Sequence, residues 1–178
     1  MCGRYANARR DADLVTAFAI DEVVGEELPP SWNVAPTDEV RAVLERAPRQ
    51  EPEGAPVRQL RTVRWGLVPS WAKDPRSGAR LINARSETVT EKPAFRKAAA
   101  RRRCLLAADA IGHIHDRTPL LVPADLIDAW LDPSVEDLGT VREMVAAMPK
   151  PVLRPRPVSK AVGDVRNDGP ELIDPVEP

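Results

Sequence analysis

The sequence is poor in aromatic residues, cysteine and histidine, and it has no long apolar run. Aromatic residues make up 4% of its 178 residues, and its two cysteines are Cys2 and Cys104. Two cysteines so far apart provide no disulfide framework of the kind found in small secreted domains. No apolar run approaches the roughly 20 residues that cross a bilayer, and no signal-peptide core follows Met1. These absences exclude membrane-spanning and disulfide-rich classes and predict a reduced, cytoplasmic location.

An excess of positive charge is also lacking. The chain has 26 basic and 27 acidic residues, a formal net charge of -1 and a pI near 6.2. Proteins that bind nucleic acid without specificity usually have a strongly basic surface, and this composition does not predict one. A local cluster does occur, formed by Arg96, Lys97, Arg101, Arg102 and Arg103. Charge alone fits phosphate binding and a solvated helix face equally well.

The remaining composition is that of a globular protein, with 43% hydrophobic and 30% charged residues. Hydrophobic periodicity predicts helices over 11–19 and 93–102, one opened by Pro123, and one capped by Ser134 with Asp137. Alternating or continuous apolar residues predict strands over 39–44, 60–65 and 104–108, with a shorter extended piece at 81–82. Frequent proline after Met148 excludes a continuous helix there. One α+β domain over residues 1–178 is the simplest architecture.

Cys2 is the residue with the most informative chemistry. Removal of Met1 next to this small residue leaves a chain that begins with cysteine, so a thiol and a free amine stand on adjacent carbons. An α-amine titrates at roughly 7.7–8.0, so a sizeable fraction is an uncharged nucleophile near neutral pH. Such a residue attacks an aldehyde through a Schiff base, which the thiol then closes to a thiazolidine. The alternative is that Cys2 is merely a tolerated small residue.

Two further clusters contain residues suited to catalysis. In the first, Asn83 both donates and accepts hydrogen bonds and Arg85 suits bidentate phosphate binding, although a simple turn fits the same residues. The second contains the two histidines, His113 and His115, which titrate near neutral pH and therefore suit proton transfer. The spacing of Cys and His matches no metal-binding motif, so no metal or other cofactor is expected. Cys104 lies in an apolar run and is interpreted as a buried structural thiol.

A set of short motifs occurs in a fixed order along almost the whole chain. The motifs are Met1-Cys2-Gly3-Arg4-Tyr5, Trp32-Asn33-Val34-Ala35-Pro36, Trp65-Gly66-Leu67-Val68-Pro69-Ser70-Trp71, Ile82-Asn83-Ala84-Arg85-Ser86-Glu87-Thr88, Lys92-Pro93-Ala94-Phe95-Arg96, Arg103-Cys104, Ile114-His115-Asp116-Arg117-Thr118-Pro119, Pro157-Val158-Ser159 and Asn167-Asp168-Gly169-Pro170. Any one of them is a weak signal, whereas the ordered set is specific. In this set the chain resembles the SOS response-associated peptidase family, also called abasic-site processing proteins.

The resemblance implies a fold and a reaction. The expected fold is a single α+β domain with a mainly antiparallel, barrel-like sheet and flanking helices. The implied activity is binding of abasic sites in single-stranded DNA, followed by a stable thiazolidine crosslink to the ring-opened deoxyribose. Cys2 would be the nucleophile, Asn83 would orient the sugar or stabilise the intermediate, and His115 would act as general acid and base in ring opening. The family is also credited with removal of its own N-terminal Met, hence the peptidase name.

The resemblance further implies how the DNA is held. Arg4 and Arg85 would contact phosphates that flank the lesion. Trp32 and Trp71 would stack on unpaired bases or wedge between them, although packing in the core fits each of them equally well. The implied partner is single-stranded DNA containing abasic sites, bound by a monomer that acts in the cytoplasm at the nucleoid.

The chain departs from the family pattern between Cys104 and His115. Family members carry an aromatic-rich motif with a catalytic glutamate after the strand equivalent to 104–108, followed by further strands. Here the chain passes from Asp109 to His115 in six residues, so an internal segment near 109–113 is missing. A sequencing or gene-model deletion, a degenerate paralogue and a shortened fold would each leave this gap. The competing function is a non-catalytic remnant that binds single-stranded DNA; a cysteine peptidase that acts on other proteins is the weaker alternative.

Overall fold

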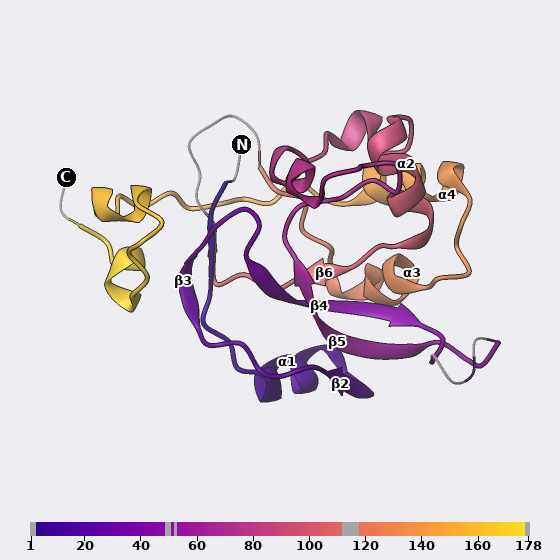
Figure 1. The fold of residues 1–178 in the computed structure, drawn as a ribbon, viewed down its shortest axis with the longest axis horizontal. Coiled ribbons are helices and arrows are strands. Elements are labelled where there is room, and N and C mark those ends of the chain that lie inside the picture. The colour runs from indigo at the N-terminus through magenta and orange to yellow at the C-terminus, as the bar shows by residue number, and fades with distance from the viewer. Residues whose placement is uncertain (1–2, 49–50, 52, 112–117, 177–178) are drawn as a thin grey trace.

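The computed structural model describes residues 3–48, 51, 53–111 and 118–176. Two β-sheets and several short helices make up this part of the chain, which confirms the predicted α+β class (Figure 1). The strands of the described residues form two open sheets and not a closed barrel, so the barrel-like detail of the expectation does not hold.

The larger sheet is built on one long hairpin. Strand β4 (Glu39–Arg46) pairs antiparallel with β5 (Val57–Arg64) at eight consecutive positions, and β2 (Glu22–Val24) lies parallel to β5. On the other edge, β4 pairs with the two-residue strand β6 (Leu105–Leu106). The strand order is therefore β2-β5-β4-β6.

The smaller sheet has three antiparallel strands in the order β3-β1-β7. Its central strand β1 (Tyr5–Asn7) pairs with β3 (Ser31–Val34) and with the two-residue strand β7 (Ala110–Ile111). Strands β6 and β7 follow one another closely in the chain and lie at edges of different sheets. The stretch 105–111 therefore links the two sheets.

The main core lies where helices pack on the hairpin. Val43 of β4 is paired with Leu60 of β5, and both side chains are buried against Leu14 of α1 (Asp11–Phe18) and Leu131 of α3 (Ile127–Leu131). Leu14 and Leu131 lie on predicted apolar helix faces, whereas the alternation over 60–65 predicted burial of Val63 and Trp65, which pack in a second cluster, and not of Leu60. Burial of such a side chain stabilises a fold by about 1.5–3 kcal/mol, so the cluster fixes the helices on the sheet.

Two longer helices and a set of 3-10 turns complete the fold. Helix α2 (Pro93–Arg101) packs beside α4 (Leu138–Ala147), as Figure 1 shows in the upper part of the view. The 3-10 turns are η1 (Pro75–Arg80), η2 (Ser86–Thr88), η3 (Ala124–Leu126), η4 (Lys160–Gly163) and η5 (Pro170–Ile173). Turns η4 and η5, with an isolated bridge between Val158 and Pro175, form a small lobe at the opposite end of the molecule. The predicted absence of a continuous helix after Met148 is confirmed.

Several predicted boundaries were wrong, each for a local reason. Strand 104–108 is reduced to Leu105–Leu106, and 81–82 is part of a turn in which the Leu81 N–H donates to the Gly78 carbonyl. The cap before α4 is Asp137 alone, whose carboxylate accepts from the Thr140 N–H at 2.7 Å. This hydrogen bond, together with one from the Thr140 hydroxyl, holds the pKa of Asp137 below its usual value.

Candidate nucleic-acid interface

A groove of about 1590 Å³ lies between the two sheets and the chain that follows them. Its walls are mostly apolar and include Trp32, Trp65 and Trp130, with Cys104 and most of residues 105–111. Segments 118–122 and 151–156 also line the groove and contribute Arg154 and Arg156. A long apolar groove with a few polar groups is typical of a binding site.

Three of the predicted site residues line this groove although they lie far apart in the sequence. Arg4 precedes β1, Trp32 belongs to β3, and Asn83 follows η1. Asn83 is exposed and engaged in an interaction of its own. Cys2, His113 and His115 lie outside the described residues, so their predicted roles stay predictions.

Asn83 owes its place to a close approach between two glycines. The φ of Gly66 is +129°, and a Cβ on this residue would lie 2.6 Å from the Gly78 carbonyl oxygen. The Leu67 N–H also donates to the Leu81 carbonyl at 3.1 Å. Because a side chain at position 66 would prevent this approach and is disfavoured by its φ, glycine is required there. The two contacts fix the loop 67–81 and with it the start of the Asn83 segment.

Arg4 is held by polar groups from two other parts of the chain. Its Nη1 donates to Asn33 Oδ1 at 2.8 Å and to the Val162 carbonyl at 3.3 Å. Asn33 belongs to β3 and is buried. Within the described residues, no carboxylate forms an ion pair with Arg4. The Arg4 guanidinium is therefore anchored by neutral groups, without an ion pair in the described part of the chain.

Tyr5 and Trp65 form the wall next to Arg4. Their ring centroids are 5.2 Å apart and the rings are nearly perpendicular at 75°, the edge-to-face arrangement that aromatic pairs favour. Burial, followed by the nearby Asp38 carboxylate, raises the pKa of the Tyr5 hydroxyl well above its ordinary value. Tyr5 is therefore neutral at physiological pH and is not a candidate base.

Cys104 was predicted to be a buried structural thiol, and this prediction was wrong. The residue is exposed and lines the groove, because the strand begins only at Leu105 and does not cover it. Its carbonyl accepts a hydrogen bond from Trp130 Nε1 at 3.2 Å. Although part of the residue is exposed, the groove walls surround the Cys104 thiol, and this burial raises its pKa.

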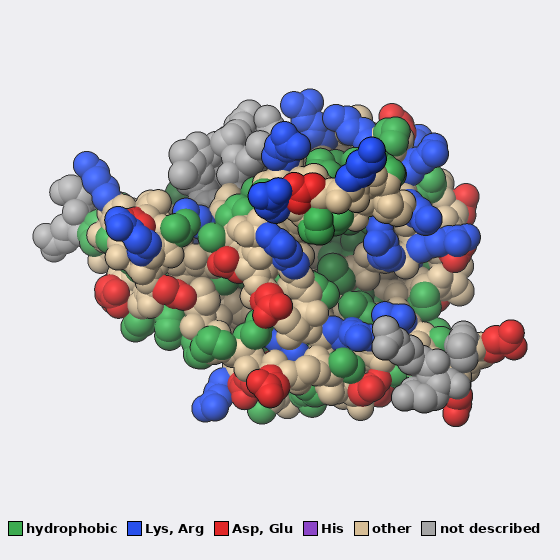
Figure 2. Space-filling model, viewed as in Figure 1, with side chains coloured by type: hydrophobic (Ala, Val, Ile, Leu, Met, Phe, Trp, Pro, Cys, Tyr) green, Lys and Arg blue, Asp and Glu red, His purple; other side chains and the backbone are tan. Residues whose placement is uncertain are grey.

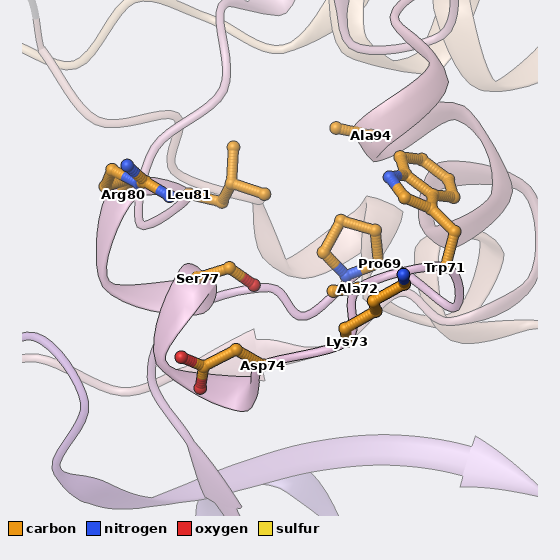
Figure 3. Close-up of a pocket in the computed structure, with 9 residues that line it drawn as sticks. All are labelled: Pro69, Trp71, Ala72, Lys73, Asp74, Ser77, Arg80, Leu81 and Ala94. Atoms are coloured by element: carbon orange, nitrogen blue, oxygen red, sulfur yellow. The ribbon is translucent and has the colours of Figure 1, made fainter.

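Trp71 and Arg85 lie outside the groove. Trp71 has 59% of its surface exposed and forms one wall of a second, smaller pocket of about 380 Å³ beside α2 (Figure 3). Lys73 and Arg80 lie on the same pocket, and the buried Ser77 Oγ has no hydrogen-bond partner in the described part of the chain. Arg85 is exposed at the start of η2. Of the predicted DNA-binding residues, Arg4 and Trp32 thus line the groove, Trp71 lines the second pocket and Arg85 lines neither.

The basic cluster of residues 96–103 contains four exposed residues and one buried residue. Arg96, Lys97, Arg101 and Arg102 are exposed on and after α2, and Figure 2 shows Lys and Arg side chains gathered over this part of the molecule. Arg103 is instead buried, and its guanidinium donates to five backbone carbonyls, those of Ala99, Ala100, Trp130, Asp132 and Val135. The exposed members can meet phosphates, whereas Arg103 holds the fold together.

The described part of the chain contains neither a cluster of metal ligands nor a membrane-spanning helix. No group of three or more His, Cys, Asp and Glu side chains in this part of the chain is arranged to hold a metal ion. No helix there is long and apolar enough to cross a membrane.

Comparison with known proteins identifies the family. The model of the SOS response associated peptidase (SRAP) family matches the chain in two overlapping stretches, residues 1–111 and 107–165. The chain belongs to the SRAP family. The two stretches of this SRAP chain meet at 107–111, the segment that contains β7 and follows β6.

Curated relatives resemble the chain in sequence, and a solved structure resembles it in fold. The chain is 27% identical over 230 residues to the abasic site processing protein YoqW of Bacillus subtilis, covering 98% of the chain and 99% of YoqW. YoaM of the same species is 40% identical over 111 residues, which cover 62% of the chain and 45% of YoaM. YedK of Escherichia coli is 26% identical over 238 residues. A solved protein from Bacteroides thetaiotaomicron, 13% identical, shares the fold with a TM-score of 0.60 over 81% of this chain and 86% of that one.

Three residues that line the groove, and Asn33, which binds Arg4, were not predicted from the sequence. Tyr5, Asn33 and Trp65 all belong to motifs that carried the family resemblance, so their presence was signalled but their contacts were not. Trp130 was assigned to an apolar helix face, and its indole N–H bond to Cys104 depends on a contact between segments 26 residues apart. No spacing rule predicts such a contact.

Proposed function

We propose that this chain binds abasic sites in single-stranded DNA and crosslinks to them through Cys2 once Met1 has been removed. The carrying observation is that Arg4, Trp32 and Asn83 line one groove although they lie far apart in the sequence. Three residue types suited to DNA meet there: a cation for phosphate, an aromatic ring for a base and an amide for a sugar. The names of the relatives YoqW, YoaM and YedK, all abasic site processing proteins, support the same lesion as substrate.

The proposed crosslink needs no oxidant or cofactor. The uncharged α-amine of Cys2 attacks the aldehyde carbon of the ring-opened deoxyribose, and loss of one water leaves an imine. The Cys2 sulfur then adds to the imine carbon while the thiol proton goes to the nitrogen, which closes the five-membered thiazolidine. His115 would transfer the protons of sugar ring opening, and Asn83 would hold the sugar oxygens. Hydrolysis of the Met1–Cys2 bond, which consumes one water, precedes these steps.

The DNA would contact both of the sites described above. Arg4 would meet a phosphate in the groove, where Trp32 would contact an unpaired base. Trp71, with its exposed indole beside Lys73 and Arg80, would stack a base further along the strand, and Arg85 would bind an adjacent phosphate. The exposed basic residues of α2 extend this surface, and they account for strand binding by a chain whose net charge is only -1.

We further propose that the chain is one SRAP domain with an internal segment missing near 109–113. The two-part match of the family model meets at this point, and the alignment with YoqW spans 230 positions against the 178 residues of this chain. The two-residue strands β6 and β7 and the open groove beside them fit such a loss. Because the family's catalytic glutamate would lie in the missing segment, we expect the crosslink to form slowly.

The test is incubation with single-stranded DNA that carries one abasic site, followed by a denaturing gel. We expect a heat-stable, slower-migrating band with the wild-type chain and none with Cys2→Ala. Cys104→Ala is the matched control, because it removes the other thiol and leaves the proposed nucleophile. Absence of the band from the wild-type chain, or its survival in Cys2→Ala, would overturn the proposal. Mass spectrometry of the purified chain checks that Met1 has been removed.

A second candidate function is reversible binding of single-stranded DNA without a crosslink. It is favoured by the same observation that supports the missing segment, the meeting of the two family-model stretches at 107–111. In this case binding would weaken steeply with salt and would be unchanged in Cys2→Ala. Loss of all retention on abasic DNA in Cys2→Ala, with no binding of intact DNA, would exclude it.

A further inference from the structure

Asn33 is a polar residue that contacts both Arg4 and the small lobe formed by η4 and η5. It is 4% exposed, and its Oδ1 accepts from Arg4 Nη1 at 2.8 Å. Its Nδ2 donates to the carbonyls of Asp164 at 3.0 Å and Asn167 at 2.8 Å. Both amide hydrogens and the amide oxygen are therefore used, so the side-chain orientation is fixed by its partners.

The lobe that Asn33 contacts is itself anchored to the same strand. The backbone N–H of Trp32 donates to Asp168 Oδ1 at 2.6 Å. Within the lobe, Asn167 Nδ2 donates to the Ala161 carbonyl at 2.9 Å. Val162, whose carbonyl accepts from Arg4, belongs to the turn η4 in this lobe. Arg4 is thus held from two sides, by β3 and by the lobe.

The contacts leave most of the Arg4 guanidinium available. Nη1 uses its hydrogens on Asn33 and Val162, while Nε and Nη2 have no partner within the described residues. An arginine presents five N–H groups in a planar fork, so the remaining three suit two phosphate oxygens. In the lobe, Asp164 pairs with Arg166, whose hydrogen bonds, followed by the charge of Arg4, lower the pKa of the Asp164 carboxyl.

We propose that Asn33 is a positioning residue, which orients Arg4 toward a phosphate of bound DNA without neutralising its charge. An aspartate at this position would form an ion pair with Arg4 and compete with the phosphate. It would also place carboxylate oxygens against the carbonyls of Asp164 and Asn167, which need a donor. The neutral amide donates to these two carbonyls and, at the same time, accepts from Arg4 without forming an ion pair. This inference rests on the proposed function, because it assumes that Arg4 meets a DNA phosphate.

The test uses single-stranded DNA with a tetrahydrofuran analogue of the abasic site, which has no aldehyde and so binds reversibly. Affinity is measured by fluorescence anisotropy at several salt concentrations. Each phosphate contact on a single strand contributes about 0.7 to the slope of log K against log salt. We expect Arg4→Ala and Asn33→Asp each to lower the slope by about 0.7. We expect Asn33→Ala to leave the slope unchanged and to weaken binding about 2–10-fold, because Arg4 must then be ordered on binding.

A double-mutant cycle separates positioning from general stability. In the Arg4→Ala background, Asn33→Ala should cause no further loss of affinity, because there is no guanidinium left to position. The double-mutant cycle does not require Asn33→Asp and remains valid if that variant does not fold. Thermal melting of each variant shows whether it is folded. An equal loss from Asn33→Ala with and without Arg4 would overturn the inference while the proposed function stands. Failure of the wild-type chain to bind the analogue would overturn the proposed function, and this inference with it.

Discussion

The β4–β5 hairpin and the chain after Cys104 reach their structures by different means. The hairpin has eight consecutive backbone pairs between Glu39 and Arg64, and its inner face is buried. The later region has the two-residue strands β6 and β7, short helices and 3-10 turns, and one isolated bridge. It is held by buried apolar residues such as Leu131 and Val141, together with Arg103 and Asn33, which bond to backbone carbonyls. Polar side chains therefore add to apolar packing where long β-ladders are lacking.

The first prediction tests the hairpin, where we expect the largest loss of stability. Leu60 is fully buried at the centre of the main core. Leu60→Ala removes its contacts and leaves a cavity, which should lower the free energy of unfolding by about 3–4 kcal/mol. Urea denaturation measures this change. The control is Val152→Ala in the later region, where the side chain is 95% exposed and the expected change is within about 0.5 kcal/mol. Equal losses would contradict the assignment of the core to the hairpin.

The second prediction tests the polar contacts of the later region. Arg103→Met keeps an apolar stem of similar length but leaves five buried or partly buried carbonyls without their donor. We expect the free energy of unfolding to fall by about 2–3 kcal/mol, because hydrogen bonds to a charged group are among the stronger ones. Urea denaturation again provides the measurement. Its neighbour provides the control, since Arg102→Met changes an exposed side chain and should have little effect. A loss below about 0.5 kcal/mol for Arg103→Met would show that packing alone holds this region.

The same comparison explains which parts of the fold were predictable. The helix over 11–19 and the strands over 39–44 and 60–65 were predicted because their apolar spacing records a buried face. The length of the strand over 104–108 was overestimated, because an apolar run does not indicate how many of its residues pair with a neighbouring strand. Only Leu105 and Leu106 meet β4. Where pairing is short, local pattern carries little information on strand length.

The sequence predicted which residues belong to the candidate site, but it did not predict how they are arranged in space. The motifs named Arg4, Trp32 and Asn83, and the fold brings these three to one groove. The same motifs named Trp71 and Arg85, which lie elsewhere. Cys104 was misplaced because its apolar neighbours suggested burial, whereas the end of the short strand leaves it at the groove wall. Contacts between distant segments, such as Arg4 with Asn33 and Val162, follow from the tertiary fold alone.

The third prediction concerns the groove wall and has the smallest expected effect. Loss of hydration raises the pKa of the Cys104 thiol, so less of the reactive thiolate is present at pH 8 than in the unfolded chain. In a Cys2→Ala background, iodoacetamide should therefore modify Cys104 several-fold more slowly in the folded protein than in urea. The midpoint of the rate against pH should also lie higher in the folded protein, whereas simple obstruction would lower the plateau and leave the midpoint in place. An unchanged midpoint would show that Cys104 is as hydrated as in the unfolded chain. The groove would then be open to water at Cys104, next to the stretch that links the two sheets.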